Sequence, residues 1–144
     1  MWVSQVTKIT YIVFEICAKI GVMKIAVSSQ NKIQVTGHAG KTSRFWIYDV
    51  SEDNQVQDKQ LLELPKEDII HVRFHQSENP YAPHPLFNMD YIITGGAGFG
   101  FVKRFSQFNV EVIISHEQDP DTAVNKFLDG TLEQLMPHRQ GNSH

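Results

Sequence analysis

The chain has 144 residues, a length typical of one domain that buries its own core without disulfides or a structural metal. Its composition, with 41% hydrophobic and 20% charged residues, is close to the globular average and excludes a disordered or low-complexity polymer. The formal net charge is -3 and no stripe of basic residues supplies the field that a phosphate backbone requires, so nucleic acid is not an expected partner.

Residues 1–22 read differently from the rest of the chain. Their apolar stretch, residues 9–22, is interrupted by Glu15 and Lys19 and is shorter than the ~20 residues that span a bilayer, so we expect no membrane segment. Met23 opens a strand-like run. The upstream residues are therefore either a start-site extension or an additional strand or helix, and the sequence leaves both interpretations open.

The first half of the domain predicts an antiparallel meander of three strands. The buried-type run 23–28 predicts the first strand, and the aromatic and β-branched run 45–48 predicts the second. Turn-forming residues at 51–54 predict a hairpin, so residues 56–64 return as the third strand and Pro65 ends it.

The segment 66–90 has a weaker pattern. Residues 69–74 fit a short strand, because β-branched residues dominate them. The prolines at positions 80, 83 and 85 predict loop for the remainder.

The second half predicts two strand-helix pairs. The apolar strand 91–94 runs into a glycine-rich turn at 95–100, and a helix follows whose apolar residues share one face: Phe101, Val102, Phe105 and Phe108. A strand at 110–114 precedes a second helix, which begins with Asp119 as its N-cap and Pro120 as its first residue and stops at Gly130. This order predicts an α/β fold with a mixed sheet, an N-terminal β-meander and C-terminal β-α-β-α units.

The same pattern predicts a three-part organisation. Residues 1–22 form an N-terminal extension, residues 23–134 form the domain, and residues 135–144 form a flexible tail. The sequence does not set the oligomeric state.

Two glycine-bearing loops resemble phosphate-binding motifs only superficially. Gly40-Lys41-Thr42 lacks the glycine five residues upstream, where Val35 stands, and a GxGxxG pattern fails at Phe101. Four glycines within residues 95–100, between a strand and a helix start, nevertheless leave backbone N–H groups unobstructed. This turn predicts an anion site, or alternatively a tight turn that uses glycine for its conformation alone.

Four of the seven histidines lie in the first glycine loop and in the irregular segment that precedes the strand at 91–94. His38 is in the first glycine loop, and His71, His75 and His84 are in the segment before the strand at 91–94. Loops that follow strand carboxyl ends gather at one sheet edge, so we expect His38 and the 95–100 loop to face one crevice. Imidazole is a ready ligand for iron or zinc, although each histidine taken singly also fits a surface or hydrogen-bonded residue.

Hydrolytic chemistry has little support in the sequence. A GxSxG motif is absent, and the single cysteine, Cys17, has no nucleophile signature around it. Cys17 cannot form an internal disulfide, a cysteine usage that fits a reducing cytoplasm. Asp49, Asp90 and Asp119 lie at strand ends, but the first strand ends in serines rather than an acid, so we interpret these carboxylates as turn residues.

Three segments together resemble the dinitrogenase iron-molybdenum cofactor biosynthesis family, the group of NifX, NifY and NifB C-terminal domains. They are Met23-Lys24-Ile25-Ala26-Val27, then Gly37-His38-Ala39-Gly40 with the run 44–49, then the run 91–100. The resemblance extends from Met23 to about Leu132. It implies a ribonuclease H-like α/β fold and a protein that binds iron-sulfur cofactor precursors or the iron-molybdenum cofactor.

The resemblance also implies site residues. His38 matches the histidine of the family's GHFG-type loop, and His84 resembles a His-Pro segment of one branch. Ala39 stands where the family usually has Phe, and Phe99 stands where Pro is common. The predicted cofactor-binding residues are His38, Gly37, Gly40, Gly95, Gly96, Gly98 and Gly100. The predicted metal ligands are His38, His71, His75 and His84, of which His71 and His75 rest on the chemistry of imidazole and not on the resemblance.

The expected function is a non-enzymatic carrier that takes up a cluster precursor and passes it to metallocluster assembly proteins. A sulfide-rich cluster is anionic, and backbone N–H groups with one or two imidazoles would hold it less firmly than four thiolates, which permits transfer. The alternative is an interaction or regulatory module of the same fold that binds a protein or a small anion and no cluster.

Overall fold

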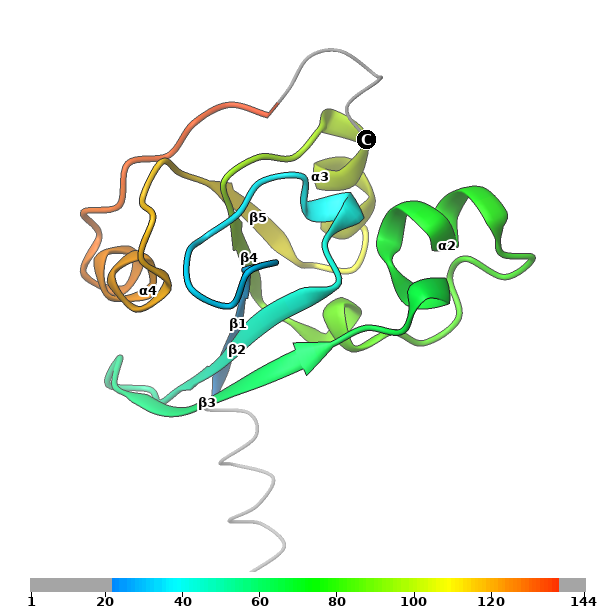
Figure 1. The fold of residues 1–144 in the computed structure, drawn as a ribbon. Helices are drawn as coiled ribbons and strands as arrows, with labels where there is room; N and C mark the ends of the chain where they lie inside the picture. Colours follow the sequence, from blue (N-terminus) through cyan, green and yellow to red (C-terminus); the bar gives the residue numbers. More distant parts are fainter. Residues whose placement is uncertain (1–21, 138–144) are drawn as a thin grey trace, which may run out of the picture.

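The computed structural model describes residues 22–137, which form a five-stranded sheet with helices on both faces (Figure 1). The predictions for residues 1–21, including Cys17, lie outside the described residues. The strands are β1 (Met23–Ser28), β2 (Arg44–Val50), β3 (Val56–Glu63), β4 (Tyr91–Thr94) and β5 (Glu111–Ile114). The α-helices are α2 (Ile70–Gln76), α3 (Phe99–Ser106) and α4 (Pro120–Asp129), and the 3-10 helices are η1 (Ala39–Lys41), η2 (Lys66–Asp68) and η3 (Pro85–Asn88).

The strand order in the sheet is β3-β2-β1-β4-β5. β1 pairs antiparallel with β2 and β2 antiparallel with β3, which is the predicted meander. β4 lies parallel to β1 on its other side, and β5 lies parallel to β4. The sheet is therefore mixed, and the predicted β-α-β-α order of the second half is present as β4, α3, β5 and α4.

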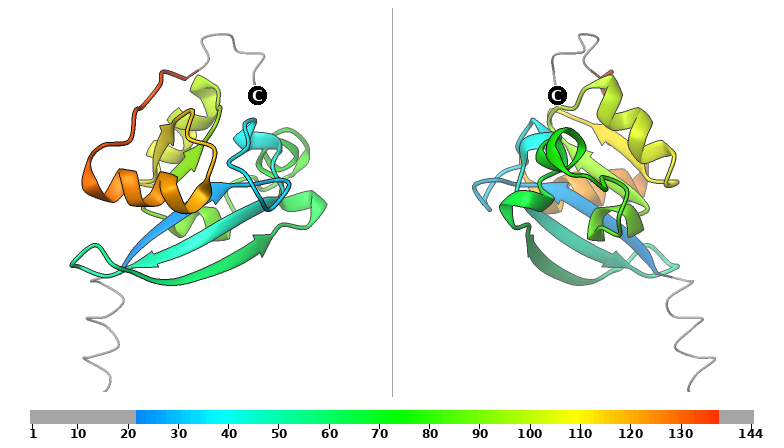
Figure 2. Two further views of the ribbon diagram at one scale, coloured as in Figure 1. Left: turned by 60° about the vertical axis from the view of Figure 1, so that its left-hand side comes forward. Right: turned by 90° about the vertical axis from the view of Figure 1, so that its right-hand side faces the viewer.

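Side chains alternate between the two faces of the sheet and build two cores. On one face, Ala26 and Ile92 pack with Phe101 and Phe105 of α3 and with Ile70 of α2. On the other face, the strands pack against α4, and the buried residues there are Ile25, Val27, Tyr48, Val50, Ile93, Ile113, Ala123, Val124 and Leu132. Figure 2 shows α4 on one side of the sheet and α3 on the other.

The prediction of a strand at residues 69–74 is wrong, because Ile70–Gln76 forms helix α2. The β-branched residues of this short segment favour a strand when they are taken one by one. Ile70, Arg73 and Phe74, however, follow the spacing i, i+3, i+4, and Ile70 and Arg73 are buried. Tertiary packing of this face overrides the local preference.

The ends of α4 agree with their predicted capping. The Asp119 carboxylate accepts a hydrogen bond from the Thr122 backbone N–H at 2.9 Å, and Pro120 is the first helical residue. Gly130 ends the helix with a left-handed backbone, φ 81°. Beyond it, the Leu135 N–H donates to the Ile114 carbonyl at 2.7 Å, so this residue of the predicted tail is held against β5.

Within residues 22–137, no helix has the length and apolar character needed to cross a bilayer.

Candidate functional site

The candidate site lies where the parallel strands β1 and β4 end. After Ser28 the chain turns toward β2, and after Thr94 it turns toward α3 and β5, on the opposite side of β1. Such a divergence of neighbouring strands is the switch point at which open α/β sheets bind ligands. The loop 29–43 and the loop 95–98 both begin there.

Backbone hydrogen bonds join these two loops directly. The Gly95 N–H donates to the Thr36 carbonyl, and the Ala39 N–H donates to the Gly96 carbonyl, each at 3.0 Å. These contacts confirm that the His38 loop and the glycine-rich loop lie side by side at one edge of the sheet, whereas the crevice between them stays a prediction.

The buried hydroxyl groups of Ser28 and Thr94 form hydrogen bonds where the two loops meet. Ser28 Oγ lies 2.8 Å from Thr94 Oγ1, and Ser28 Oγ also donates to the Thr36 carbonyl at 2.6 Å. Thr94 Oγ1 lies 3.2 Å from both the Thr36 and the Gly96 carbonyl oxygens. The sequence pattern did not single out this pair. The pattern did contain one indication of it, because each of the two buried strands ends in a hydroxyl residue.

The glycines of the two loops serve different purposes. Of the described glycines, only Gly130 has a positive φ, so a left-handed backbone does not explain the others. A Cβ on Gly95 would approach the backbone of Thr36 and Gly37 at 3.4 Å, and a Cβ on Gly37 would lie 3.6 Å from the Gly96 nitrogen. A Cβ would therefore be at the short limit of van der Waals contact at Gly95 and in ordinary contact at Gly37. A Cβ on Gly100, in contrast, would meet no atom within 4 Å.

His38 flanks η1 and is exposed. Its backbone is left-handed, with φ 55° and ψ 54°, and its carbonyl accepts a hydrogen bond from the Lys41 N–H at 2.8 Å. A left-handed backbone is uncommon for a residue other than glycine, although histidine is among the side chains that adopt it more often. The imidazole is thus carried on a tight turn directly beside Gly96.

His71 and His75 lie on α2, which packs against η1 (Figure 1). Their ring centroids are 4.5 Å apart. The pKa of His71 is lowered from its ordinary value, chiefly by burial and further by His75 and by the positive charge of Lys41. Both imidazoles therefore lie near the loop that carries His38.

His84 is placed differently from the other predicted metal ligands. Its side chain is 2% exposed, its Nδ1 accepts a hydrogen bond from the Leu86 N–H at 3.0 Å, and its Nε2 lies 2.8 Å from the Asp68 carbonyl. Burial is the main cause that lowers its pKa. Because both ring nitrogens are engaged with the backbone, this geometry is incompatible with the metal role predicted for His84.

Arg73, which the sequence analysis did not single out, organises the same segment. Its buried guanidinium donates to the Pro83 carbonyl at 3.2 Å and lies 3.9 Å from the Asp68 carboxylate. Arg73 and His84 thus hold the proline-rich segment against α2. The local sequence around Arg73 does not indicate this structural role.

The four predicted histidines therefore do not form one cluster. Within the described part of the chain, no group of three or more His, Cys, Asp or Glu side chains is arranged to hold a metal ion. His38 stands at the η1 turn, His71 and His75 form a pair on α2, and His84 is a backbone partner.

Comparison with known protein families decides the identity. The model of the dinitrogenase iron-molybdenum cofactor family matches residues 21–130. The chain belongs to this family. The resemblance that the sequence motifs indicated is thereby confirmed, and comparison with curated proteins gives no match.

Solved structures share the fold of this dinitrogenase iron-molybdenum cofactor family member. A crystal structure of a candidate dinitrogenase from Methanocaldococcus jannaschii has 18% identity and a TM-score of 0.57, with 81% of this chain and 98% of that chain covered. A candidate NifB protein from Thermotoga has 17% identity and a TM-score of 0.55, with 83% and 99% covered. The apo orange protein from Desulfovibrio gigas has 17% identity and a TM-score of 0.57, with 82% and 97% covered. At these identities the likeness shows the fold alone.

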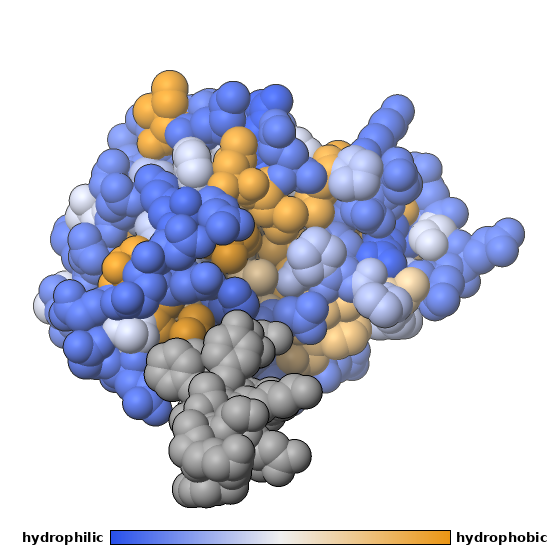
Figure 3. Space-filling view, turned by 90° about the horizontal axis from the view of Figure 1, so that it is seen from below, coloured by the Kyte–Doolittle hydropathy of each residue, from blue (hydrophilic) through white to orange (hydrophobic). Residues whose placement is uncertain are grey.

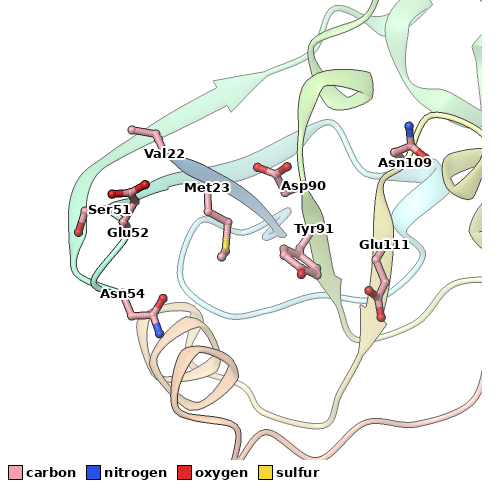
Figure 4. A pocket seen from close by; sticks show the side chains of 9 residues that line it. All are labelled: Val22, Met23, Ser51, Glu52, Asn54, Asp90, Tyr91, Asn109 and Glu111. Carbon is pink, nitrogen blue, oxygen red and sulfur yellow. The ribbon is translucent and has the colours of Figure 1, made fainter. Parts of the chain in front are cut away.

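A separate cavity of about 600 Å³ opens at the opposite edge of the family member's sheet, near the strand starts at Met23, Tyr91 and Glu111. The carboxylates of Glu52 and Asp90 also line it, but Figure 4 shows the acidic side chains spread around the cavity rather than converging. From below, apolar side chains gather in a hollow on this side of the molecule and hydrophilic ones surround it (Figure 3). This cavity contains none of the predicted site residues.

Proposed function

We propose that this family member is a non-enzymatic carrier that binds an iron-sulfur or iron-molybdenum cofactor precursor during nitrogenase-type metallocluster assembly. Membership of the family supports the pathway, and the switch point between β1 and β4 supports the place of binding. We infer a ribonuclease H-like fold from the same resemblance, with which the order β3-β2-β1-β4-β5 is consistent. Metallocluster assembly proteins in the cytoplasm are the proposed partners.

Gly100 is the observation that carries this proposal. It lies in the first turn of α3, its φ is not positive, and a Cβ there would meet open space. Glycine in a helix is less stable than alanine by about 0.5–1 kcal/mol, so neither the backbone nor packing explains this residue. A bare backbone at a helix N-terminus does suit a ligand that approaches the unpaired N–H groups closely.

His38 supports the proposal in the same way. A left-handed backbone costs an ordinary residue about 1–2 kcal/mol, and glycine would adopt it without strain. A histidine is nevertheless present at this exposed position, next to the glycine loop. We assign its imidazole to an exposed metal atom of the bound cluster.

The arrangement suits an anionic, sulfide-rich cargo that must be released. The first-turn N–H groups of α3 and the Lys41 ammonium provide positive potential, and Phe99, which is 46% exposed, provides an apolar wall. The sequence has a single cysteine, so imidazole and backbone contacts rather than several thiolates hold the cluster. Such contacts are weak enough for transfer to an acceptor protein.

The test is anaerobic loading of the full chain with an iron-sulfur cofactor precursor, followed by desalting and measurement of retained iron and visible absorbance. We expect His38→Gly to lose most of the retained cluster while it unfolds no more easily than the parent, because glycine relaxes the left-handed turn. His116→Ala, at an exposed position after β5, is the control and retains cluster.

Two outcomes count against the proposal. If His38→Gly retained as much cluster as the parent, His38 would not be a ligand of the cluster. No retention by the parent would reject the carrier function and favour an interaction or regulatory module, whose partner would then be sought by pull-down.

A further inference from the structure

The histidine pair on α2 has a geometry of its own. His71 and His75 are one helical turn apart, so their side chains project from the same face of α2. Their ring centroids lie 4.5 Å apart with the ring planes tilted by 48°. His71 is half-buried and His75 is exposed, so the pair opens to solvent at one end.

We propose that His71 and His75 bind one divalent transition-metal ion of borderline softness, with Zn²⁺ as the representative. Two histidines four residues apart on one helix face are a recurrent zinc-binding arrangement. Zn–N distances of about 2.0–2.1 Å bring both imidazoles within reach of one ion after small side-chain rotations. This inference goes beyond the proposed function and does not depend on it.

The two rings offer a chelate from one helix face. Metal ions bind neutral imidazole, and an ion bound to one ring of the pair has the second ring beside it, with centroids 4.5 Å apart.

The proposed metal site leaves coordination positions unfilled by protein, so its metal ion can exchange. Within residues 22–137, no third His, Cys, Asp or Glu completes a cluster with this pair, so water fills the remaining coordination positions. A site with two protein ligands binds more weakly than the four-ligand structural zinc sites, and it takes up and releases its ion readily.

Lys41 distinguishes a cation site from an anion site. Its charge acts on His71 from η1, across the contact between η1 and α2. Removing this charge should tighten the binding of Zn²⁺ by about three- to tenfold, the effect of one charge several ångströms away in a solvated site. An anion site at the same place would be weakened by the same change.

The experiment measures Zn²⁺ binding to the full chain by equilibrium dialysis, together with the imidazole nitrogen resonances by NMR. We expect His75→Ala to lose one zinc equivalent per chain at a fixed free Zn²⁺ concentration. Because His75 is exposed, this variant tests the site without disturbing the core. Lys41→Met should bind Zn²⁺ more tightly, and His116→Ala should bind it like the parent.

The outcomes separate this inference from the carrier function. A zinc equivalent that survives His75→Ala, or ring resonances of His71 and His75 that do not move with Zn²⁺, would overturn it. Weaker Zn²⁺ binding by Lys41→Met would also contradict it. Cluster loading that fails while Zn²⁺ still binds to the pair would reject only the carrier function.

Discussion

Gly95 follows β4 and Gly100 lies in the first turn of α3, and the two glycines have different surroundings. The backbone of the neighbouring loop lies 3.4 Å from where a Cβ of Gly95 would be, at the short limit of van der Waals contact. Gly100 has open space at the same place. At the scale of the residue, Gly95 therefore faces a neighbouring backbone, whereas Gly100 faces open space, where the proposed ligand would bind.

We predict that Gly100→Ala raises the free energy of unfolding by up to about 0.5–1 kcal/mol, because alanine favours the helix, and that it lowers cluster retention. Gly95→Ala is the matched comparison and should raise the free energy of unfolding less than Gly100→Ala, because its Cβ would lie 3.4 Å from the backbone of the neighbouring loop. Urea unfolding and anaerobic loading measure both quantities. A Gly100→Ala protein with unchanged cluster retention would contradict the ligand role of this glycine.

Helix α4 is attached to the sheet by a polar contact as well as by its apolar face. The buried Tyr48 hydroxyl donates to the Asp121 carboxylate at 2.6 Å, and the Lys59 ammonium lies 2.8 Å from the same carboxylate oxygen. Burial and the Asp121 carboxylate raise the pKa of Tyr48, so its hydroxyl keeps the proton that it donates. The hydrogen bonds from Lys59 and Tyr48 lower the pKa of Asp121.

We predict that Asp121→Asn lowers the free energy of unfolding by about 0.5–1.5 kcal/mol at pH 7. Because the folded pKa of Asp121 is lowered, its contribution is complete above its ordinary value of 3.8 and is lost as the pH falls through the folded pKa. The difference between variant and parent should therefore shrink in acid. Asp58→Asn is the control, since that exposed carboxylate contacts the Gln60 amide on its own strand. Urea unfolding at pH 7 and pH 3 measures the effect, and a difference independent of pH would contradict it.

The packing of the segment from η2 to η3 depends on the buried, neutral imidazole of His84. His84 bridges the Asp68 carbonyl and the Leu86 N–H, and burial keeps its pKa below the ordinary value of 6.5. A group whose folded pKa is lowered stabilises the protein fully above its unfolded pKa, and this stabilisation is lost as the pH falls through the folded pKa.

We predict that His84→Gln lowers the free energy of unfolding by about 1–3 kcal/mol at pH 7.5, because it breaks a buried pair of backbone contacts. It should also flatten the loss of stability between pH 6.5 and pH 5. Some slope will remain, since the pKa of His71 is lowered too. Denaturant midpoints across this pH range measure both effects, with His116→Gln as the control. A slope as steep as that of the parent would show that His84 does not titrate with unfolding.

The molecule as a whole is built around β1, which has neighbours on both sides and helices on both faces. β3 is an edge strand, and its residues 56–60 are exposed. This gradient of burial implies a gradient of local stability across the sheet.

We predict that the backbone amides of Ile25, Ala26 and Val27 exchange hydrogen at rates set by global unfolding, whereas those of β3 exchange at least about tenfold faster through local opening. Native-state hydrogen exchange followed by NMR provides the measurement. Equal protection of β1 and β3 would contradict the assignment of β3 as the weakly held edge.

The sequence by itself determined the features that neighbouring residues encode. Alternation and β-branched runs set the five strands, and Asp119, Pro120 and Gly130 set the ends of α4, because these signals act within a few residues. The order of the elements also brought the His38 loop and the glycine-rich loop to one edge of the sheet, since parallel strands place their following loops at the same edge.

Only the tertiary structure decided the features that depend on contacts between residues far apart in the sequence. Residues 70–74 became helical because Ile70 and Arg73 are buried against another part of the chain. His84 became a backbone partner rather than a ligand because Asp68, sixteen residues away, meets its ring. The different surroundings of Gly95 and Gly100 follow from which atoms the fold places opposite them. Burial and contact are long-range properties, so local pattern does not specify them.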